Sequence, residues 1–445
     1  MPAELTVRRR ADLEADEASR LAFCAVPSTA ATHRHAMTES GQHSDVRTAF
    51  QRDRDRIVHS RAFRRLKHKT QVYVPHTGDH PRTRLTHTLE VAQFARTIAR
   101  ALALNEDLTE AIALAHDLGH TPFGHSGERA LARICAGAQE GCPLPEAVVG
   151  ELGTFKHNYQ SVRVVDLLEH RYDHPGINLS DQVREGVLKH TTWKVNFPFP
   201  LPTTDGLRLG LPCHLEGQVV ALADEIAQQT HDLEDGLANE SVQLSAVERL
   251  RAAGLVMDRL GDGYRGERHH GRRAALLQRG LIDLFIEDAV NATATAVTAV
   301  ARRLGVATRE DWQRHTDEIP AVTVALSAPV AEVFAELKAF VYRFIINHLE
   351  VNRQDWRATL VVSQLFRAYH QNPLTLPTYA LLRFAEASGR NYLRDVEISQ
   401  IPEEVRSHYH PDPRFARIIV DHLAGMSDRF ALEEHEALYH PHAAL

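Results

Sequence analysis

Apolar side chains recur at helical spacing through most of the chain. In the segment after His87, four of them lie at intervals that put them near one side of a helix: Leu89, Phe94, Ile98 and Leu102. A break at Asn105 precedes a second apolar run from Leu108 to Leu118, which stops at Gly119. The pattern therefore predicts two helices joined by a short turn.

The same periodicity continues toward the C-terminal end. It predicts further helices, of which the clearest are 218–233, 274–304 and 332–349. Clusters of Gly, Pro and polar residues predict loops at 137–145, 197–212 and 261–273. Because no segment alternates polar and apolar residues as a half-buried strand does, we expect an all-α fold.

Residues 1–45 lack sustained periodicity and are expected to form a loosely ordered N-terminal arm. They contain no apolar signal-peptide stretch, and no apolar run in the chain approaches the roughly 18 residues of a membrane span. Four widely spaced cysteines predict neither a disulfide framework nor a zinc ribbon: Cys24, Cys135, Cys142 and Cys213. We therefore expect a cytoplasmic protein without a membrane partner.

Positive charge is concentrated in one stretch, although the net charge of the chain is -7. From Arg47 to Lys69, seven Arg and two Lys stand against two Asp, a local excess of +7. Two interpretations stay open for this stretch: a solvated helical face, or a wall that binds anions.

Candidate metal chemistry begins with the adjacent residues His116 and Asp117. An imidazole nitrogen and a carboxylate oxygen can bind one divalent cation together. The pair alone is weak evidence, because the chain has 28 histidines and a second His-Asp pair at positions 231 and 232. Two more candidate ligands lie on neighbouring predicted helices, His87 before the pair and Asp224 after it.

The order His, His-Asp, Asp resembles that of the HD-domain phosphohydrolases. Five stretches are similar to one branch of that superfamily, the dGTPase-like triphosphohydrolases: 52–71, 82–91, 116–128, 157–161 and 223–235. The resemblance is specific over about residues 45–240 and general beyond them. It implies an HD-domain helical core at 46–240, with 241–445 as a C-terminal helical region packed on that core.

The resemblance also implies a set of metal ligands: His87, His116, Asp117 and Asp224. They would hold one divalent cation per site, and their mixed nitrogen and oxygen donors suit Mn, Fe, Zn, Co or Ni alike. Mg would accompany the nucleotide.

The matching positions of the family imply five substrate-binding residues: Gln71, Val72, Arg84, His157 and Asp232. Gln71 and Val72 would contact the sugar, while Arg84 and His157 would contact the phosphates. Two alternatives stay open: Gln71 and Val72 finish a helix and pack in the core, and Asp232 is polar lining of the helix stripe that carries Asp224.

Three of the residues that follow the His-Asp pair are candidates for catalysis. His120 lies four residues after His116 and can point into the same cavity. Glu128 lies three residues after His125 and can reach back to it, and a histidine held by a carboxylate is a suitable proton donor. The family places catalysis at these positions, so we take His125, Glu128 and His120 as the catalytic candidates.

The activity that the resemblance implies is removal of the whole triphosphate from a deoxynucleoside triphosphate (dNTP). A metal-activated water would attack the α-phosphorus while His125 protonates the departing 5′ oxygen. Two alternatives are an HD-family phosphodiesterase or stringent-nucleotide hydrolase, and a nucleotide-sensing or single-strand nucleic-acid-binding protein. Relatives form oligomers, so a homo-oligomer is expected, with single-stranded nucleic acid as a second partner.

Overall fold

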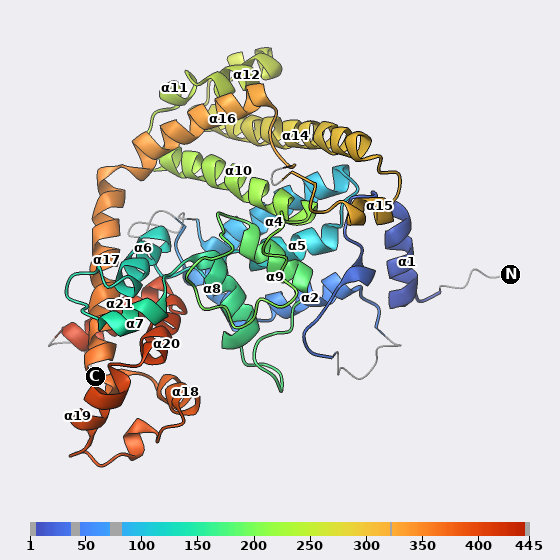
Figure 1. The fold of residues 1–445 in the computed structure, drawn as a ribbon. Coiled ribbons are helices and arrows are strands. Elements are labelled where there is room, and N and C mark those ends of the chain that lie inside the picture. Colours follow the sequence, from blue (N-terminus) through green and yellow to red (C-terminus); the bar gives the residue numbers. More distant parts are fainter. Residues whose placement is uncertain (1–5, 37–44, 72–81, 321–322, 441–445) are drawn as a thin grey trace.

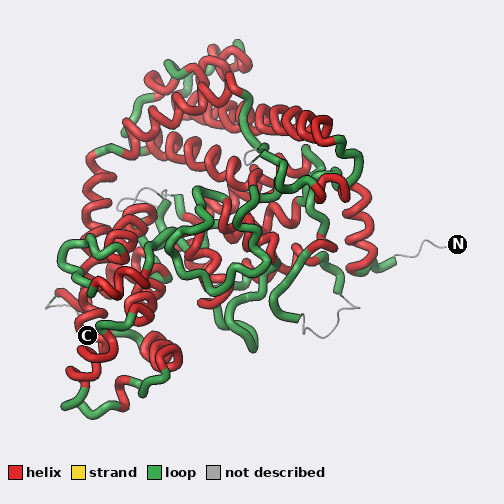
Figure 2. The backbone as a smooth tube through the Cα atoms, in the orientation of Figure 1, coloured by secondary structure: helices red, strands yellow, loops and turns green. Residues whose placement is uncertain are grey.

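The fold, taken from a computed structural model, is helical throughout the residues that the structure describes: 6–36, 45–71, 82–320 and 323–440 (Figures 1 and 2). These residues contain no strand, only three isolated bridges that join His33 to Ser180, Thr70 to Thr83, and His170 to Gly176. The predicted all-α class is confirmed.

The centre of the molecule is built around the long helix α10 (Leu215–Ala238). Helices α4 (Arg84–Ala101) and α5 (Glu106–Ala115) form a hairpin, and α10 packs on both. Helix α9 (Asp181–Lys189) contacts α5 and α10, while α2 (Ala49–Val58) packs on α5 and α8 (His157–Arg163) packs on α9. Three helices therefore bring together the segments that carry the candidate metal ligands.

Local capping explains where the central hairpin begins and turns. The Thr83 hydroxyl accepts a hydrogen bond from the backbone N–H of Thr86 at the start of α4, and the Asn105 side chain accepts one from Leu108 at the start of α5. The predicted break at Asn105 is thus confirmed. The placement of Leu89 with the other three is wrong: Leu89 is 51% exposed, because it lies five positions before Phe94, which turns it to another face of the helix.

The predicted apolar run to Leu118 is also too long, since α5 ends at Ala115. Ser161 from α8 donates its hydroxyl hydrogen to the carbonyl of His116 and accepts a hydrogen bond from the N–H of Gly119, both at 2.8 Å. A side chain from another helix therefore ends α5 just where the His-Asp pair begins.

An outer layer covers α10 on the side away from α5 (Figure 1). It consists of α11 (Leu244–Val247), α12 (Arg251–Leu260), α13 (Asp262–Arg265), α14 (His270–Leu304) and α16 (Ala328–Val341). Among the described residues, α14 is long and apolar enough to cross a membrane by length and composition alone. That is weak evidence, because a core helix passes the same test, and α14 packs on α4, α10 and α12.

The C-terminal helices lie on the side of the molecule away from α1 (Figure 1) and meet the centre through two helices of the first half. Helix α17 (Leu349–Gln371) packs on α6 (Gly124–Cys135), and α20 (Pro413–Ala424) packs on α7 (Glu146–Leu152). The others are α18 (Thr378–Ser388), α19 (Ile401–Glu404) and α21 (Asp428–Tyr439). Short 3-10 or π turns complete the C-terminal half at Tyr342–Ile346, Pro373–Thr375, Leu393–Asp395 and Val405–Tyr409.

Part of the predicted loose arm is helical, namely α1 (Arg10–Arg20). Buried Glu17 fixes this helix to the rest of the protein. Its carboxylate accepts hydrogen bonds from the Ser28 N–H at 2.7 Å and from Asn105 at 2.9 Å. The remaining short helices are α3 (Arg61–Arg65), α15 (Arg309–Arg314), and turns at Ser28–Ala30, Leu66–His68 and Val164–Leu168. The division of the chain at residues 45 and 240 stays a prediction.

Candidate metal centre and active site

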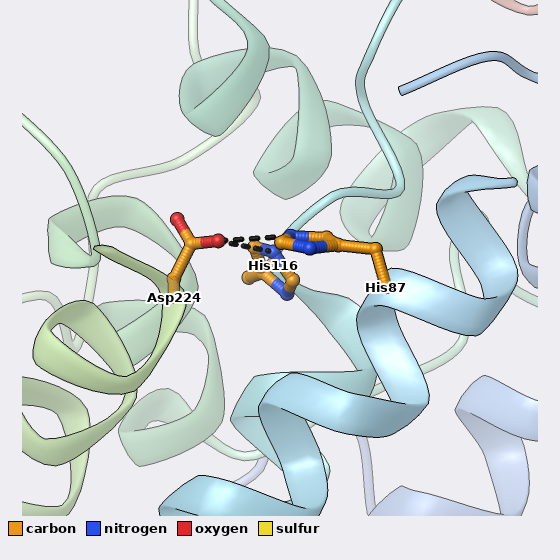
Figure 3. A group of neighbouring side chains, drawn as sticks. All are labelled: His87, His116 and Asp224. Atoms are coloured by element: carbon orange, nitrogen blue, oxygen red, sulfur yellow. Dashed lines mark hydrogen bonds and ion pairs between the residues drawn. The ribbon is translucent and has the colours of Figure 1, made fainter. Parts of the chain in front are cut away.

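The four candidate metal ligands converge between α4, the end of α5 and α10. Asp224 Oδ1 lies 2.9 Å from His87 Nε2 and 3.6 Å from His116 Nε2 (Figure 3). Asp117 Oδ1 lies 3.4 Å from the same nitrogen of His116. The helices thus bring together side chains that are more than a hundred residues apart in the sequence.

The state of His116 supports cation binding by this group. Its Nδ1 lies 2.6 Å from the carbonyl of Ala113 and donates to it, so Nε2 is the nitrogen left to take up a proton or a cation. That nitrogen is buried and has no hydrogen-bond partner. Burial opposes a charge on the ring, yet Asp117 and Asp224 outweigh it and raise the pKa of His116 to about 9.

The two carboxylates likewise favour a positive neighbour. Burial raises the pKa of Asp117 and of Asp224, but the surrounding His side chains, together with Arg84 at Asp117, hold both well below the ordinary value. A buried site that keeps its carboxylates ionised and attracts a proton to His116 also suits a divalent cation, which binds in place of the proton. The residues present fit such a cation, as HD domains require, and two nitrogens with two carboxylates do not select one metal.

Two further side chains, His231 and Glu90, support His87 on the side away from Asp224. Nδ1 of His87 lies 3.3 Å from Nδ1 of buried His231, and Nε2 of His231 lies 3.3 Å from a carboxylate oxygen of Glu90. Such partners orient a ligating imidazole. The second His-Asp pair therefore begins with a residue that supports a ligand.

Arg84 forms an ion pair with one of the four ligands and has two further hydrogen-bond donors beside them. Its Nη1 donates to Asp117 Oδ2 at 2.6 Å, whereas its buried Nε and Nη2 have no hydrogen-bond partner among the residues that the structure describes. Guanidinium donors buried in this way are costly unless an anion accepts from them. This geometry suits a phosphate group next to the cation.

The catalytic candidates form a second cluster beside Asp117. His120 Nε2 lies 3.0 Å from Asp117 Oδ1, and the His120 ring stacks on that of His157 at 3.9 Å. Glu128 Oε2 lies 2.8 Å from His157 Nδ1 but 3.7 Å from His125 Nδ1. The expected reach of Glu128 toward His125 is therefore present at longer range, and the direct hydrogen bond goes to His157.

Within this cluster, His120 is neutral whereas Glu128 is ionised. Burial and then Arg84 hold the pKa of His120 well below its usual value, so its contact with Asp117 is a hydrogen bond of a neutral ring. Burial raises the pKa of Glu128, but the His157 and His125 side chains outweigh it and keep the carboxylate ionised.

His190 joins the cluster without having been predicted. It lies at the end of α9, with Nε2 at 3.3 Å from His157 Nε2 and its ring at 5.1 Å from that of His116. Its Nδ1 bonds the Val187 carbonyl at 2.7 Å, and burial lowers its pKa to about 3. No sequence motif surrounds this residue; only the packing of α9 on α5 and α8 reveals it.

The expected sugar contacts are only partly visible. Gln71 is buried and its Oε1 has no hydrogen-bond partner in the described part of the chain, from which Val72 is left out. Asp232 is buried on α10, and burial with the charge of Asp235 raises its pKa to about 8. Asp232 can therefore carry a proton at neutral pH and donate as well as accept a hydrogen bond.

A strained turn links the metal ligands to α6. Phe123 has φ of 62° and Gly124 has φ of 58°, so two successive residues are left-handed. For a residue with a Cβ this conformation costs roughly 1–2 kcal/mol, and it persists where surrounding contacts fix it. Gly124 also permits close approach, because a Cβ there would lie 3.1 Å from Arg84 Nη2.

Most of the basic stretch faces partners inside the protein. Arg47 bonds Asp55 at 2.9 Å, and Arg54 bonds Glu110 at 3.1 Å. Lys69 is buried, donates to the carbonyls of His120 and Ala424, and has its pKa lowered by burial to about 7. These contacts account for much of the positive charge without an anion-binding wall.

Comparison with known proteins agrees with this geometry. The family model of the HD domain matches residues 84–228, and that of the phosphohydrolase-associated domain matches 324–397 and 390–437. A relative from Geobacter sulfurreducens is 39% identical over 401 residues, covering 89% of this chain and 90% of the relative. Another, from Nitrobacter hamburgensis, is 41% identical over 422 residues, covering 89% and 91%. Both are named deoxyguanosinetriphosphate triphosphohydrolase-like proteins.

Proposed function

The chain belongs to the HD-domain family of deoxyguanosinetriphosphate triphosphohydrolase-like proteins, and we propose that it cleaves dNTPs at the α-phosphorus to give a deoxynucleoside and tripolyphosphate. The observation that carries this proposal is the position of Arg84. Its two unpartnered guanidinium nitrogens are buried beside a group of ligands that fits a divalent cation. A phosphate-bearing substrate satisfies both features together.

His87, His116, Asp117 and Asp224 would hold the cation. When bound, it would lower the pKa of a water molecule and neutralise phosphate charge. Arg84 binds a phosphate oxygen through Nε and Nη2, while His120 and His157 line the same side. Because these groups are held before the substrate arrives, they stabilise developing charge without reorganising.

His125 is the proposed general acid for the departing 5′ oxygen. Its side chain is 49% exposed, so it can reach a substrate in the open part of the site. Glu128 stands 3.7 Å from it and bonds His157, which keeps negative charge beside the two rings. A carboxylate this close can orient the imidazole of His125 for proton transfer to the departing oxygen.

Gln71 and Asp232 are proposed to contact the sugar. Both are buried and each has an oxygen without a hydrogen-bond partner, Oε1 of Gln71 and Oδ1 of Asp232. Val72 is proposed to pack against the 2′ carbon of the same sugar. The expected homo-oligomer, single-stranded nucleic-acid partner, nucleotide-bound Mg and cytoplasmic location are parts of the same proposal.

The decisive experiment is identification of the first products. Purified protein with added Mn is incubated with each of the four dNTPs, singly and mixed, and the products are separated by ion-exchange chromatography. We expect deoxynucleoside and tripolyphosphate in equal amounts. Pyrophosphate with a monophosphate, or orthophosphate with a diphosphate, as first products would refute attack at the α-phosphorus.

A further inference from the structure

Asp428, the first residue of α21, bonds two segments that border the candidate active site. Its Oδ2 accepts a hydrogen bond from the Thr70 N–H at 2.9 Å and another from the Thr70 hydroxyl. Its Oδ1 accepts one from the Phe123 N–H at 2.9 Å. Thr70 directly precedes Gln71, and Phe123 lies in the turn between His120 and His125.

A carboxylate is the side chain that these contacts require. All three bonds need an acceptor, and an ionised Asp accepts at both oxygens. The Asp428 side chain is buried, so a lost bond there is not replaced freely by water. An Asn of the same shape would turn an N–H₂ group toward at least one of the donors.

The turn that Asp428 holds is the strained one. Phe123 and Gly124 are both left-handed, and the Phe123 N–H is the group that Asp428 accepts from. A backbone in a sparsely populated conformation depends on such contacts to stay there. Release of the Phe123 amide therefore lets the turn relax and move His125, which follows it by two residues.

Other contacts connect the segments on either side of this turn to the C-terminal half. Lys69 donates to the carbonyl of His120 on one side and to that of Ala424, before α21, at 2.9 Å on the other. On α17, Asp355 accepts from the hydroxyl of Ser126 and from Arg129 at 2.8 Å. The start of α6 is thus held by segments that come more than two hundred residues later.

We propose that Asp428 is a positioning residue, which fixes the turn of Phe123 so that His125 points at the leaving oxygen. The inference rests on the proposed function, and it gives the C-terminal helices a part in the reaction that acts through His125. Asp428 itself need not touch the substrate.

The test compares Asp428→Asn with Ser427→Ala. Ser427 caps α21 by accepting from the Phe430 N–H at 3.2 Å, so its loss weakens the same helix but leaves the carboxylate in place. For Asp428→Asn we expect kcat to fall roughly 10- to 100-fold, as for an active-site group displaced by about 1 Å. KM and bound metal should change less than about 3-fold, and Ser427→Ala should keep near wild-type turnover.

A double variant separates positioning from general damage. If Asp428 acts through His125, adding Asp428→Asn to His125→Ala should cost less than about 3-fold more. An undiminished loss in that background, or an equal loss in Ser427→Ala, would overturn the proposal. If Asp428→Asn does not fold, Thr70→Val removes one of the three bonds and should lower kcat in the same way by a smaller factor.

Hydrogen exchange keeps this inference separate from the proposed function. Asp428→Asn should speed exchange of the Phe123 amide at least about tenfold, with little change in Ser427→Ala. Unchanged exchange at Phe123 would refute the anchoring role whatever the substrate is. A wild type that cleaves no dNTP, with faster exchange in Asp428→Asn, would sink the proposed function and leave the anchor standing.

Discussion

His125 is more exposed than Glu128, the carboxylate beside it. Replacing it with Ala should lower kcat by about 10²- to 10⁴-fold, the usual contribution of a general acid. Nucleotide affinity and metal content should be nearly unchanged, because His125 is not among the ligands. Steady-state kinetics and metal analysis check this, with half-exposed His315→Ala at the end of α15 as the control. Unaltered turnover in His125→Ala would assign the proton to another group.

His116 is expected to be indispensable for cation binding. Its buried Nε2 has no hydrogen-bond partner among the described residues, so His116→Ala removes a ligand atom that is free to bind the cation. We expect bound metal after dialysis to drop by more than about tenfold, and activity with it. Chelation of the wild type should abolish turnover, and added Mn should restore it. A His116→Ala protein with full metal content and turnover would disprove the metal assignment.

Residue identities at the candidate site were largely predictable, but their contacts were not. The order of the candidate metal ligands and the motifs around them were enough to choose His87, His116, Asp117 and Asp224. The helices bring these side chains together. His190 could not, because it stands outside any motif and enters the cluster through the packing of α9. The hydrogen-bond partner of Glu128 could not be predicted from the spacing of residues along the chain either, because His157 comes from α8 and lies nearer than His125.

At the scale of elements, Gly119 shows how closely the turn after α5 packs on α8. A Cβ at this position would lie 2.2 Å from the backbone nitrogen of Ser161 and 2.4 Å from the carbonyl oxygen of His157. Because both are backbone atoms, Gly119→Ala must push the helices apart, and we expect it to lower the free energy of unfolding by about 3 kcal/mol or more. Urea denaturation measures this.

Gly150 in α7 provides the matched control. No heavy atom lies within 4 Å of a Cβ placed there, and the residue is helical. Gly150→Ala should therefore raise the free energy of unfolding by about 0.5–1 kcal/mol, through helix propensity. If both substitutions lowered the free energy of unfolding by similar amounts, the close approach at Gly119 would not be the cause of the destabilisation.

The helices themselves followed from periodicity, whereas several of their ends did not. Asn105 marks its boundary through a local cap that a sequence can reveal. The end of α5 depends on Ser161, which reaches it from another helix, and the apolar run continues past that point. Helix α1 escaped prediction because its charged sequence lacks a clear apolar stripe, while Glu17 anchors it through tertiary bonds.

For the whole molecule, the buried histidines of the C-terminal helices predict loss of stability in acid. Burial lowers the pKa of His370 and of His422 to about 4. The unfolded chain takes up a proton on each near pH 6.5, so the free energy of unfolding falls as the pH drops from about 6.5 toward 4. For each residue the loss at pH 5 is about 1–2 kcal/mol.

His370→Phe tests this dependence. The ring that replaces His370 can still stack between Phe366 and His410, but it binds no proton. We expect the variant to lose less thermal stability than the wild type between pH 7.5 and pH 5, as followed by circular dichroism. Parallel losses in the two proteins would mean that His370 does not contribute to the acid sensitivity.

The late position of Asp428 has a consequence for how the protein is made. Synthesis proceeds from the N-terminal end and earlier segments fold first, so Asp224 emerges long before Asp428. A chain whose translation stops between these two residues has all four candidate ligands, yet it lacks the carboxylate that anchors Phe123. With Asp428 in its proposed role, such an unfinished chain would carry the candidate ligands without the anchored turn of Phe123, so full activity would be acquired only when synthesis is nearly complete.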